Sequence, residues 1–374
     1  MAAFALTDAT RVADVAALRT RFGARAPVLV ETTLLRRRAL VKLPDAGGWL
    51  LTDEAVQQAT AAPVAEHRAG RIARAAPGAA VHDVTCSVGA ELAALRKTTD
   101  RVLGSDLDPV RLAMARHNVG AGVGLVQADA LRPVSRNTVV LADPGRRRAG
   151  RRRFHPADYE PALEQLLDAY QGRQIIVKCA PGIDFATVRH MGFDGEIEIT
   201  SWRGSVREAC LWSPGLSAPG VSRRASILDR DEEITDAEAA DCAVAPAGRW
   251  IIDPDGAVVR AGLVRHYGAR HGLWQLDPDI AYLSGDRLPP GVRGFEVLEQ
   301  LPYREKRLAQ VLSGLACGAL EILVRGVDID PDALRRRLRL RGHRSLSVVI
   351  TRIGSGPAGR IVAFVCCPSV SAGR

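Results

Sequence analysis

The sequence predicts an α/β fold, in which a mostly parallel sheet lies between an N-terminal helical region and a C-terminal α+β domain. Residues 8–76 form alanine-rich amphipathic stretches, which are typical of helices. From Ala79, short apolar runs alternate with helix-compatible segments, the pattern of strand–helix–strand units. After residue 249 strand-like runs dominate, and a chain of 374 residues is long enough for two or three domains.

Residues 1–77 are predicted to be the helical region. Thr52 or Asp53 is the expected cap of one helix, because their side-chain oxygens accept hydrogen bonds from the first turn. That helical stretch should end near Pro77-Gly78. Pro63 lies inside it and should kink or divide it, because proline has no backbone N–H to donate.

Residues 78–215 are predicted to form the α/β domain. Helices are expected at 108–118 and 156–170, and the runs 196–202 and 207–213 are expected to add strands, with an antiparallel edge as one arrangement. The apolar runs expected as parallel strands are Ala80–Thr85, Val102–Leu107, Gly124–Asp129, Thr138–Pro144 and Gln174–Cys179.

Two further segments complete the predicted organisation. Residues 216–248 are rich in Ser, Ala, Pro and acidic groups, which indicates a linker. Residues 249–374 contain several strand-like runs and a helix near 332–340, which predicts a compact α+β domain.

Acidic residues mark the candidate site. Asp83 lies in the first strand-like run, Asp106 ends the second and Asp129 ends the third. In a doubly wound sheet the ligand lies beyond the carboxyl ends of adjacent strands. Asp106 is therefore placed to accept hydrogen bonds from both ribose hydroxyls of a nucleoside, and Asp129 to face the adenine amino group.

The sequence of the loop after the first strand distinguishes between two candidate cofactors. Thr85, Ser87 and Gly89 supply small side chains, where a cofactor must approach the backbone closely. A dinucleotide needs a G-x-G-x-x-G loop that holds its pyrophosphate, and this loop has one glycine. S-adenosylmethionine carries no phosphate and is favoured, although ordinary acidic turn caps would give the same pattern.

The fourth strand-like run leads directly into Asp143-Pro144. This position places a carboxylate at the carboxyl edge of the sheet, where a methyl acceptor would be oriented. Methyl transfer is an in-line displacement, so alignment and electrostatics are what an enzyme contributes. Asp143 is a candidate acceptor of a hydrogen bond from the attacking group, and a simple Asp-Pro turn is the alternative.

Charge suggests a phosphate-rich partner. The chain has 51 Lys and Arg against 42 Asp and Glu, a formal net charge of +9. A dense cationic run follows the Asp-Pro pair, and its position favours binding of an RNA backbone over a merely solvated loop. The run consists of Arg146, Arg147, Arg148, Arg151, Arg152 and Arg153.

The remaining patterns argue against several other classes of protein. The seven cysteines are scattered without CxxC pairs, which predicts no metal site and reduced thiols. The N-terminus lacks the features of a signal peptide, and no apolar run is long enough to span a membrane. We therefore expect a cytoplasmic protein, of an oligomeric state that the sequence leaves open.

Taken in order, the segments HDVTCSVGAE, VLGSDLDP, QADA and LADPGRR resemble the motif series of class I S-adenosylmethionine-dependent methyltransferases. The helical segment before them and the segments GAVVRAGLVRHYG, FEVLEQLPYREKRL and ALEILVRGVDIDPDALRRRLRLRG are similar to a bacterial family of these enzymes with ferredoxin-like and THUMP-like C-terminal parts. The resemblance therefore covers nearly the whole chain.

This resemblance implies a Rossmann-like sheet, S-adenosylmethionine as cofactor and RNA delivery by the C-terminal domain. It implies that Asp106 binds the ribose, Asp129 faces the adenine and Asp143-Pro144 orients the acceptor. Two departures from the family pattern stand out. Cys86 and Ser87 replace glycines of the first loop, and Asp-Pro-Gly-Arg replaces Asp-Pro-Pro-Tyr, so the aromatic side chain that stacks on a flipped base is missing.

Cys179 ends the fifth strand, in a Cys-Ala-Pro context that is similar to that of the nucleophilic cysteine of uracil C5 methyltransferases. A small buried thiol is the alternative reading.

The sequence thus favours a methyltransferase that acts on tRNA or rRNA. A methyltransferase of a small molecule or protein, and a catalytically silent RNA-binding protein, remain as alternatives.

Overall fold

A computed structural model describes residues 4–145, 147–148, 151–152, 156–354 and 359–369. The chain divides into two compact units, Met1–Ser222 and Arg223–Arg374. Among the described residues, no helix combines the length and the apolar composition that crossing a membrane requires.

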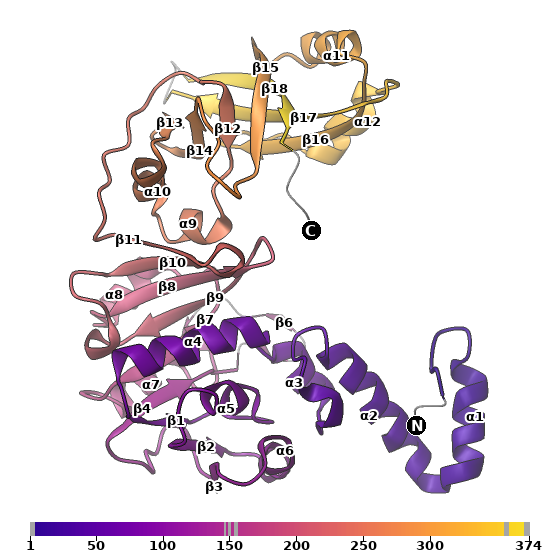
Figure 1. Cartoon of the computed structure of the whole chain (residues 1–374), viewed down its shortest axis with the longest axis vertical. Helices are drawn as coiled ribbons and strands as arrows, with labels where there is room; N and C mark the ends of the chain where they lie inside the picture. The colour runs from indigo at the N-terminus through magenta and orange to yellow at the C-terminus, as the bar shows by residue number, and fades with distance from the viewer. Residues whose placement is uncertain (1–3, 146, 149–150, 153–155, 355–358, 370–374) are drawn as a thin grey trace. The chain divides into compact units, whose positions relative to one another are not determined.

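The first unit begins with helices that the alanine-rich stretches predicted (Figure 1). Thr52 caps α3, because its hydroxyl accepts a hydrogen bond from the Ala55 N–H at 3.1 Å. Pro63 lies in the first turn of the next helix, where a missing N–H costs nothing, so it separates two helices as predicted. The helices are α1 (Arg11–Phe22), α2 (Ala26–Ala39), α3 (Asp53–Gln58) and α4 (Ala62–Ala75).

The sheet of this unit has the strand order β8-β9-β7-β4-β1-β2-β3. β7, β4, β1, β2 and β3 run parallel, whereas β9 is antiparallel to both β7 and β8. The expected strands and the antiparallel edge are therefore confirmed. Their bounds are β1 (Ala80–Asp83), β2 (Val102–Asp106), β3 (Gly124–Gln127), β4 (Thr138–Ala142), β7 (Ile175–Cys179), β8 (Glu196–Trp202) and β9 (Ser205–Trp212).

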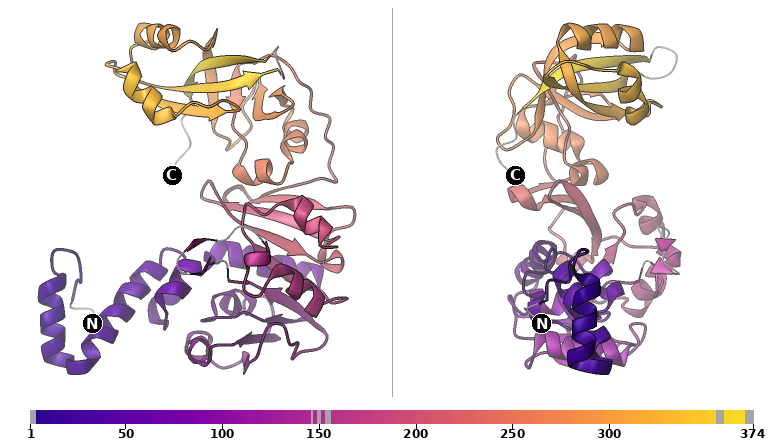
Figure 2. Two further views of the ribbon diagram at one scale, coloured as in Figure 1. Left: turned by 180° about the vertical axis from the view of Figure 1, so that it is seen from behind. Right: turned by 90° about the vertical axis from the view of Figure 1, so that its right-hand side faces the viewer.

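Helices cover both faces of the sheet. α4, α5 (Ala90–Leu95) and α6 (Pro109–Val119) pack on one face, where side chains such as Ile72, Leu92 and Leu141 share a core. α7 (Leu163–Ala169) and α8 (Phe185–His190) lie on the other face (Figure 2). The short strands β5 (Arg147–Arg148) and β6 (Arg151–Arg152) form a separate antiparallel pair.

The second unit contains a hairpin and a mixed sheet. The sheet has the order β13-β14-β12-β15-β18-β17-β16, and β16 and β17 are parallel because α12 connects them. Its strands are β12 (Trp250–Ile252), β13 (Trp274–Asp277), β14 (Ile280–Gly285), β15 (Gly294–Pro302), β16 (Cys317–Arg325), β17 (Arg344–Ile353) and β18 (Arg360–Pro368). Its helices are α9 (Gly256–Arg260), α10 (Val264–His271), α11 (Glu305–Gly314) and α12 (Pro331–Leu338).

The segment 216–248, expected to be a linker, differs from that expectation. It contains β10 (Arg223–Ile227) and β11 (Glu232–Thr235), which pair as an antiparallel hairpin. Ala225, Ile227 and Ile234 are buried. The two strands therefore form with only a few buried apolar residues, although their other residues are polar. The two units divide after Ser222, inside the segment that composition had marked as a linker.

Candidate active site

A cavity of about 970 Å³ lies at the carboxyl edge of the parallel strands in the first unit. The predicted residues Asp83, Asp106, Asp129 and Asp143 all line it; the first two end β1 and β2, and the last two follow β3 and β4. Thr85 and Ser87 from the first loop line it too. The structure therefore brings together six of the residues that the sequence singled out.

Hydrogen bonds tie the loops of this edge to one another. The Asp106 carboxylate accepts a bond from the Ser87 N–H at 2.9 Å, and the Asp83 carboxyl accepts one from the Thr85 N–H at 3.1 Å. The Thr85 hydroxyl accepts a bond from the Asp143 N–H at 2.7 Å. The first loop is thereby fixed to the ends of β2 and β4.

Gly89 and Pro144, two further residues predicted for the site, do not line this larger cavity. Gly89 precedes α5 with φ +90°, and a Cβ there would lie 2.9 Å from a Val119 side-chain carbon. Glycine is therefore required by backbone conformation and by close packing of α5 on α6. Pro144 lines a second, adjacent cavity of about 410 Å³.

The second cavity meets the first at the end of β4. Asp143, Gly145 and Thr60 line both cavities. Asp143 therefore borders both cavities.

Lys178 is a site residue that the sequence analysis missed. Its ammonium is buried on β7, 2.5 Å from an Asp143 carboxylate oxygen and 3.0 Å from one of Glu91. It also donates to the Thr60 hydroxyl. Burial alone would lower the pKa of Lys178, but Asp143 and Glu91 outweigh it and raise that pKa. One signal was present in the sequence, because a lysine inside the apolar run Ile175–Cys179 must be buried with a partner.

Glu91 extends this cluster toward α4. Its second carboxylate oxygen pairs with Arg68, and Arg68 also pairs with Glu208. Burial opposes ionisation of Glu91, but Arg68 and Lys178 outweigh it and lower the pKa of Glu91 to about 2. The cluster is therefore a chain of alternating charges that joins α4, α5 and β7.

Asp83 differs from Glu91, because its pKa is raised and not lowered. It is buried beside Glu91, and its burial together with the negative charge of Glu91 raises the pKa of Asp83 to about 8. Its carboxyl group is therefore largely protonated at neutral pH while the site holds no added cation.

The N-terminal helical region also contributes to the site, which composition did not indicate. Glu54, Ala55 and Gln58 of α3 line the larger cavity. Glu54 pairs with Arg111 of α6 at 2.5 Å, and this ion pair holds α3 against the sheet domain.

Cys179 lies away from the cavity walls, and the arginine run is described only in part. Cys179 is fully buried on β7, its sulfur lies 3.8 Å from the Val177 carbonyl oxygen, and it is absent from the described residues that line either cavity. In the arginine run, the backbones of residues 147–148 and 151–152 form the β5–β6 pair. Their side chains, and all of Arg146 and Arg153, lie outside the described residues.

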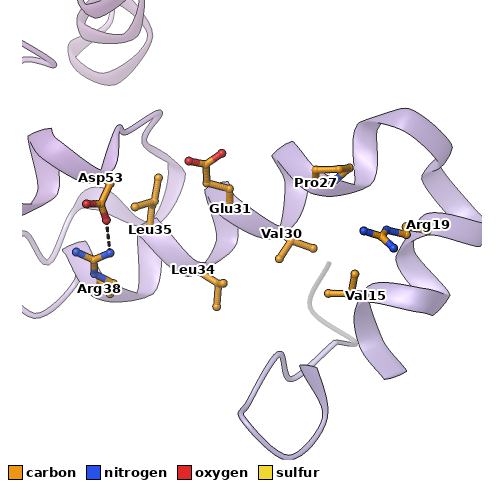
Figure 3. Close-up of a pocket in the computed structure, with 9 residues that line it drawn as sticks. All are labelled: Val15, Arg19, Pro27, Val30, Glu31, Leu34, Leu35, Arg38 and Asp53. Atoms are coloured by element: carbon orange, nitrogen blue, oxygen red, sulfur yellow. Dashed lines mark hydrogen bonds and ion pairs between the residues drawn. The ribbon is translucent and has the colours of Figure 1, made fainter. Parts of the chain in front are cut away.

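A further cavity, of about 340 Å³, lies between α1 and α2 (Figure 3). Val15, Val30 and Leu34 give it apolar walls, and the Arg38–Asp53 ion pair of 2.5 Å lies at one end. Its lining residues all come from the N-terminal helices, so it is separate from the strand edge that carries the candidate site.

The sheet order, the acidic side chains at neighbouring strand ends and the cavity between them define a class I S-adenosylmethionine-dependent methyltransferase. Two Mycobacterium tuberculosis proteins, from strains CDC 1551 / Oshkosh and ATCC 25618 / H37Rv, are named uncharacterized S-adenosylmethionine-dependent methyltransferases. Each is 67% identical to this chain over 361 residues, 94% of this chain and 100% of the relative.

Residues 292–368 match the family model described as THUMP domain-like. The chain belongs to the class I S-adenosylmethionine-dependent methyltransferases that carry a C-terminal THUMP-like domain. A crystal structure from Porphyromonas gingivalis W83, described as a candidate methyltransferase, has the same fold. It superimposes with a TM-score of 0.73 at 18% identity and covers 92% of this chain and 91% of that one.

The larger cavity fits the charge of S-adenosylmethionine. This cofactor carries a sulfonium cation, an ammonium cation and a carboxylate, so its net charge is positive, and negative charge on the cavity wall stabilises the two cations. Among the described residues, the basic side chains of the wall are Arg111 and Lys178. The acidic ones are Glu54, Asp83, Glu91, Asp106, Asp108, Asp129, Asp143, Asp158 and Glu160.

Replacing Lys178 should destabilise the fold. In the Lys178→Met variant, Asp143 and Glu91 lose a buried cation, and removing one member of a buried ion pair costs about 3–5 kcal/mol. Urea unfolding followed by circular dichroism measures the loss. The control is Lys97→Met, whose half-exposed ion pair with Glu66 contributes about 1 kcal/mol or less. Equal stabilities of the two variants would contradict the role given to Lys178.

Asp83 should make stability depend on pH. The folded chain keeps the Asp83 proton up to about pH 8, whereas the unfolded chain releases it near pH ~4. Between these values the folded state binds the extra proton, so the free energy of unfolding falls as pH rises. The Asp83→Asn variant lacks this titration. Urea unfolding of both proteins at about pH 5 and about pH 8 should therefore show the wild type losing stability relative to the variant. Parallel behaviour of the two proteins would rule this out.

Proposed function

We propose that the chain methylates a base of tRNA or rRNA, with Asp143-Pro144 orienting the acceptor. The observation that carries this proposal is the Asp143 carboxylate, which Lys178 holds at the junction of the two cavities. The THUMP-like domain at residues 292–368 and the net charge of +9 support RNA as the substrate.

The proposal assigns the larger cavity to the cofactor. Asp106 would bind the ribose hydroxyls and Asp129 would face the adenine, since both side chains line the cavity from neighbouring strand ends. Asp83, Thr85 and Ser87 would surround the charged amino-acid end. Gly89 contributes by letting α5 begin close to α6.

Bound S-adenosylmethionine supplies an electrophilic methyl group for an in-line displacement. Asp143 accepts a hydrogen bond from the attacking amine and so directs its lone pair toward the larger cavity. Lys178 and the Thr85 hydroxyl fix Asp143 from two sides, so little reorganisation is needed. Cys179 has no part in this scheme, because its thiol is buried in the sheet.

The arginine run Arg146–Arg148 and Arg151–Arg153 is proposed to bind the RNA backbone, since it follows the Asp143-Pro144 pair directly. An RNA substrate of this kind places the enzyme in the cytoplasm. Charged side chains also line the second cavity, which favours RNA over the small apolar acceptor that a closed, apolar pocket would suit.

Transfer of labelled methyl groups tests the proposal. Purified protein is incubated with methyl-tritiated S-adenosylmethionine and total RNA from cells that lack the gene, and the labelled nucleoside is identified by mass spectrometry. The wild type should label RNA, and Asp143→Asn should lower the rate at least about 100-fold, because the neutral amide no longer offers the attacking amine a charged acceptor. Calorimetry should show that the variant still binds the cofactor, so that the loss of rate is not a loss of cofactor. Label found in protein or small molecules, with none in RNA, would contradict the proposal.

A further inference from the structure

The second cavity has a composition unlike that of the cofactor cavity. It lies beside Asp143, Pro144 and Gly145, on the side away from most of the acidic wall. Besides these three residues, it is lined by Val41, Lys42, Gln57, Gln58, Ala59, Thr60, Ala61, Ala180, Pro181, Trp202, Arg203, Val206, Arg207 and Glu208. An aromatic ring, two exposed arginines and a lysine therefore lie beside the proposed acceptor position.

Trp202 is the aromatic side chain of this cavity. It ends β8, is partly exposed, and precedes a turn in which Arg203 and Gly204 have φ +52° and φ +63°. The turn returns the chain into β9, so that Arg207 lies beside Trp202 and donates a hydrogen bond from Nε to the Trp202 carbonyl oxygen at 2.9 Å. The ring is thus held at the cavity wall by the β8–β9 hairpin.

Two guanidinium groups accompany the ring. The Arg203 guanidinium carbon lies 4.4 Å from the Trp202 ring centroid, and that of Arg207 lies 5.2 Å from it. Both arginine side chains are exposed, so they can turn toward solvent or toward a ligand. A planar aromatic flanked by arginines is the arrangement that stacks a nucleobase and binds its phosphate.

Each carboxylate that lines this cavity is already paired with a buried cation. Glu208 is paired with buried Arg68, and Asp143 with Lys178. Lys42 donates hydrogen bonds to the backbone carbonyls of Val56 and Gln57 at 3.1 and 2.9 Å, which fixes the segment that separates the two cavities. Arg203 and Arg207 therefore give this cavity a net attraction for anions, whereas the cofactor cavity attracts cations.

We infer that Trp202, Arg203 and Arg207 form the subsite that receives a base of the RNA and its phosphate next to Asp143. The inference rests on the proposed function and adds to it the place where the base stacks. It also accounts for the missing aromatic of the Asp143-Pro144-Gly145-Arg146 motif. The ring that this motif lacks comes from β8, which lies on the antiparallel side of the same sheet.

Kinetics of variants test the subsite. With the RNA that the wild type labels, Trp202→Ala should raise KM for RNA about tenfold or more, because stacking of one base is lost. Trp202→Phe should recover most of this effect, because a ring remains. The double variant Arg203→Ala/Arg207→Ala should raise KM for RNA and reduce its dependence on salt. Arg101→Ala, an exposed arginine at the opposite end of β2, is the matched control and should change neither.

Two binding measurements separate this subsite from folding and from the cofactor cavity. Calorimetry should give the same affinity for S-adenosylmethionine in all variants. A short oligoadenylate should quench the tryptophan fluorescence of the wild type more than that of Trp202→Phe.

The outcomes are distinguishable. A wild type that labels no RNA contradicts the proposed function. A wild type that labels RNA, together with Trp202→Ala of unchanged KM, overturns the subsite alone. Trp202→Phe as impaired as Trp202→Ala would also overturn it, because a stacked ring is preserved in the phenylalanine variant.

Discussion

The ammonium of Lys178 is the charge on which this site depends. It is buried between the carboxylates of Asp143 and Glu91, and Glu91 continues through Arg68 to Glu208. Each of these groups would be costly to bury alone, because water no longer solvates it. They are stable as an alternating series, which fixes the end of β4 relative to α4 and α5.

The same principle attaches the N-terminal helices to the sheet. Arg71 of α4 contacts Glu196 and Glu198 of β8 at 2.6 and 2.8 Å, and its guanidinium lies 3.9 Å from the Trp212 ring centroid. α4 in turn leads back to Thr60 and α3, which line the cavities. Charge complementarity inside the core therefore positions a wall of the active site that lies outside the Rossmann-like sheet.

Much of the fold could be predicted because each strand of the parallel sheet is encoded by a short, continuous stretch of sequence. Each strand of the parallel sheet is a short apolar run, and parallel strands bring their carboxyl ends to one edge. Asp83, Asp106, Asp129 and Asp143 could therefore be placed in one site before the structure was known. The hairpin of β10 and β11 was missed, since its polar residues resemble a linker in composition.

The rest of the site depends on pairings between distant segments. Glu91 and Lys178 are 87 residues apart, and Arg68 and Glu208 are 140 apart, so no spacing in the sequence connects them. Trp202 likewise reaches the second cavity from β8, far along the sequence from Asp143 and Pro144, which line the same cavity. The local pattern identified the strand ends that line the larger cavity, whereas the second cavity is formed by tertiary contacts between distant segments.

A crystal structure of the chain with S-adenosylhomocysteine, the product form of the cofactor, tests the central claim most directly. The ribose hydroxyls should lie within hydrogen-bonding distance of Asp106, the adenine beside Asp129, and the sulfur should face Asp143 at the junction of the two cavities. A nucleoside bound elsewhere, or a sulfur directed away from Asp143, would contradict it.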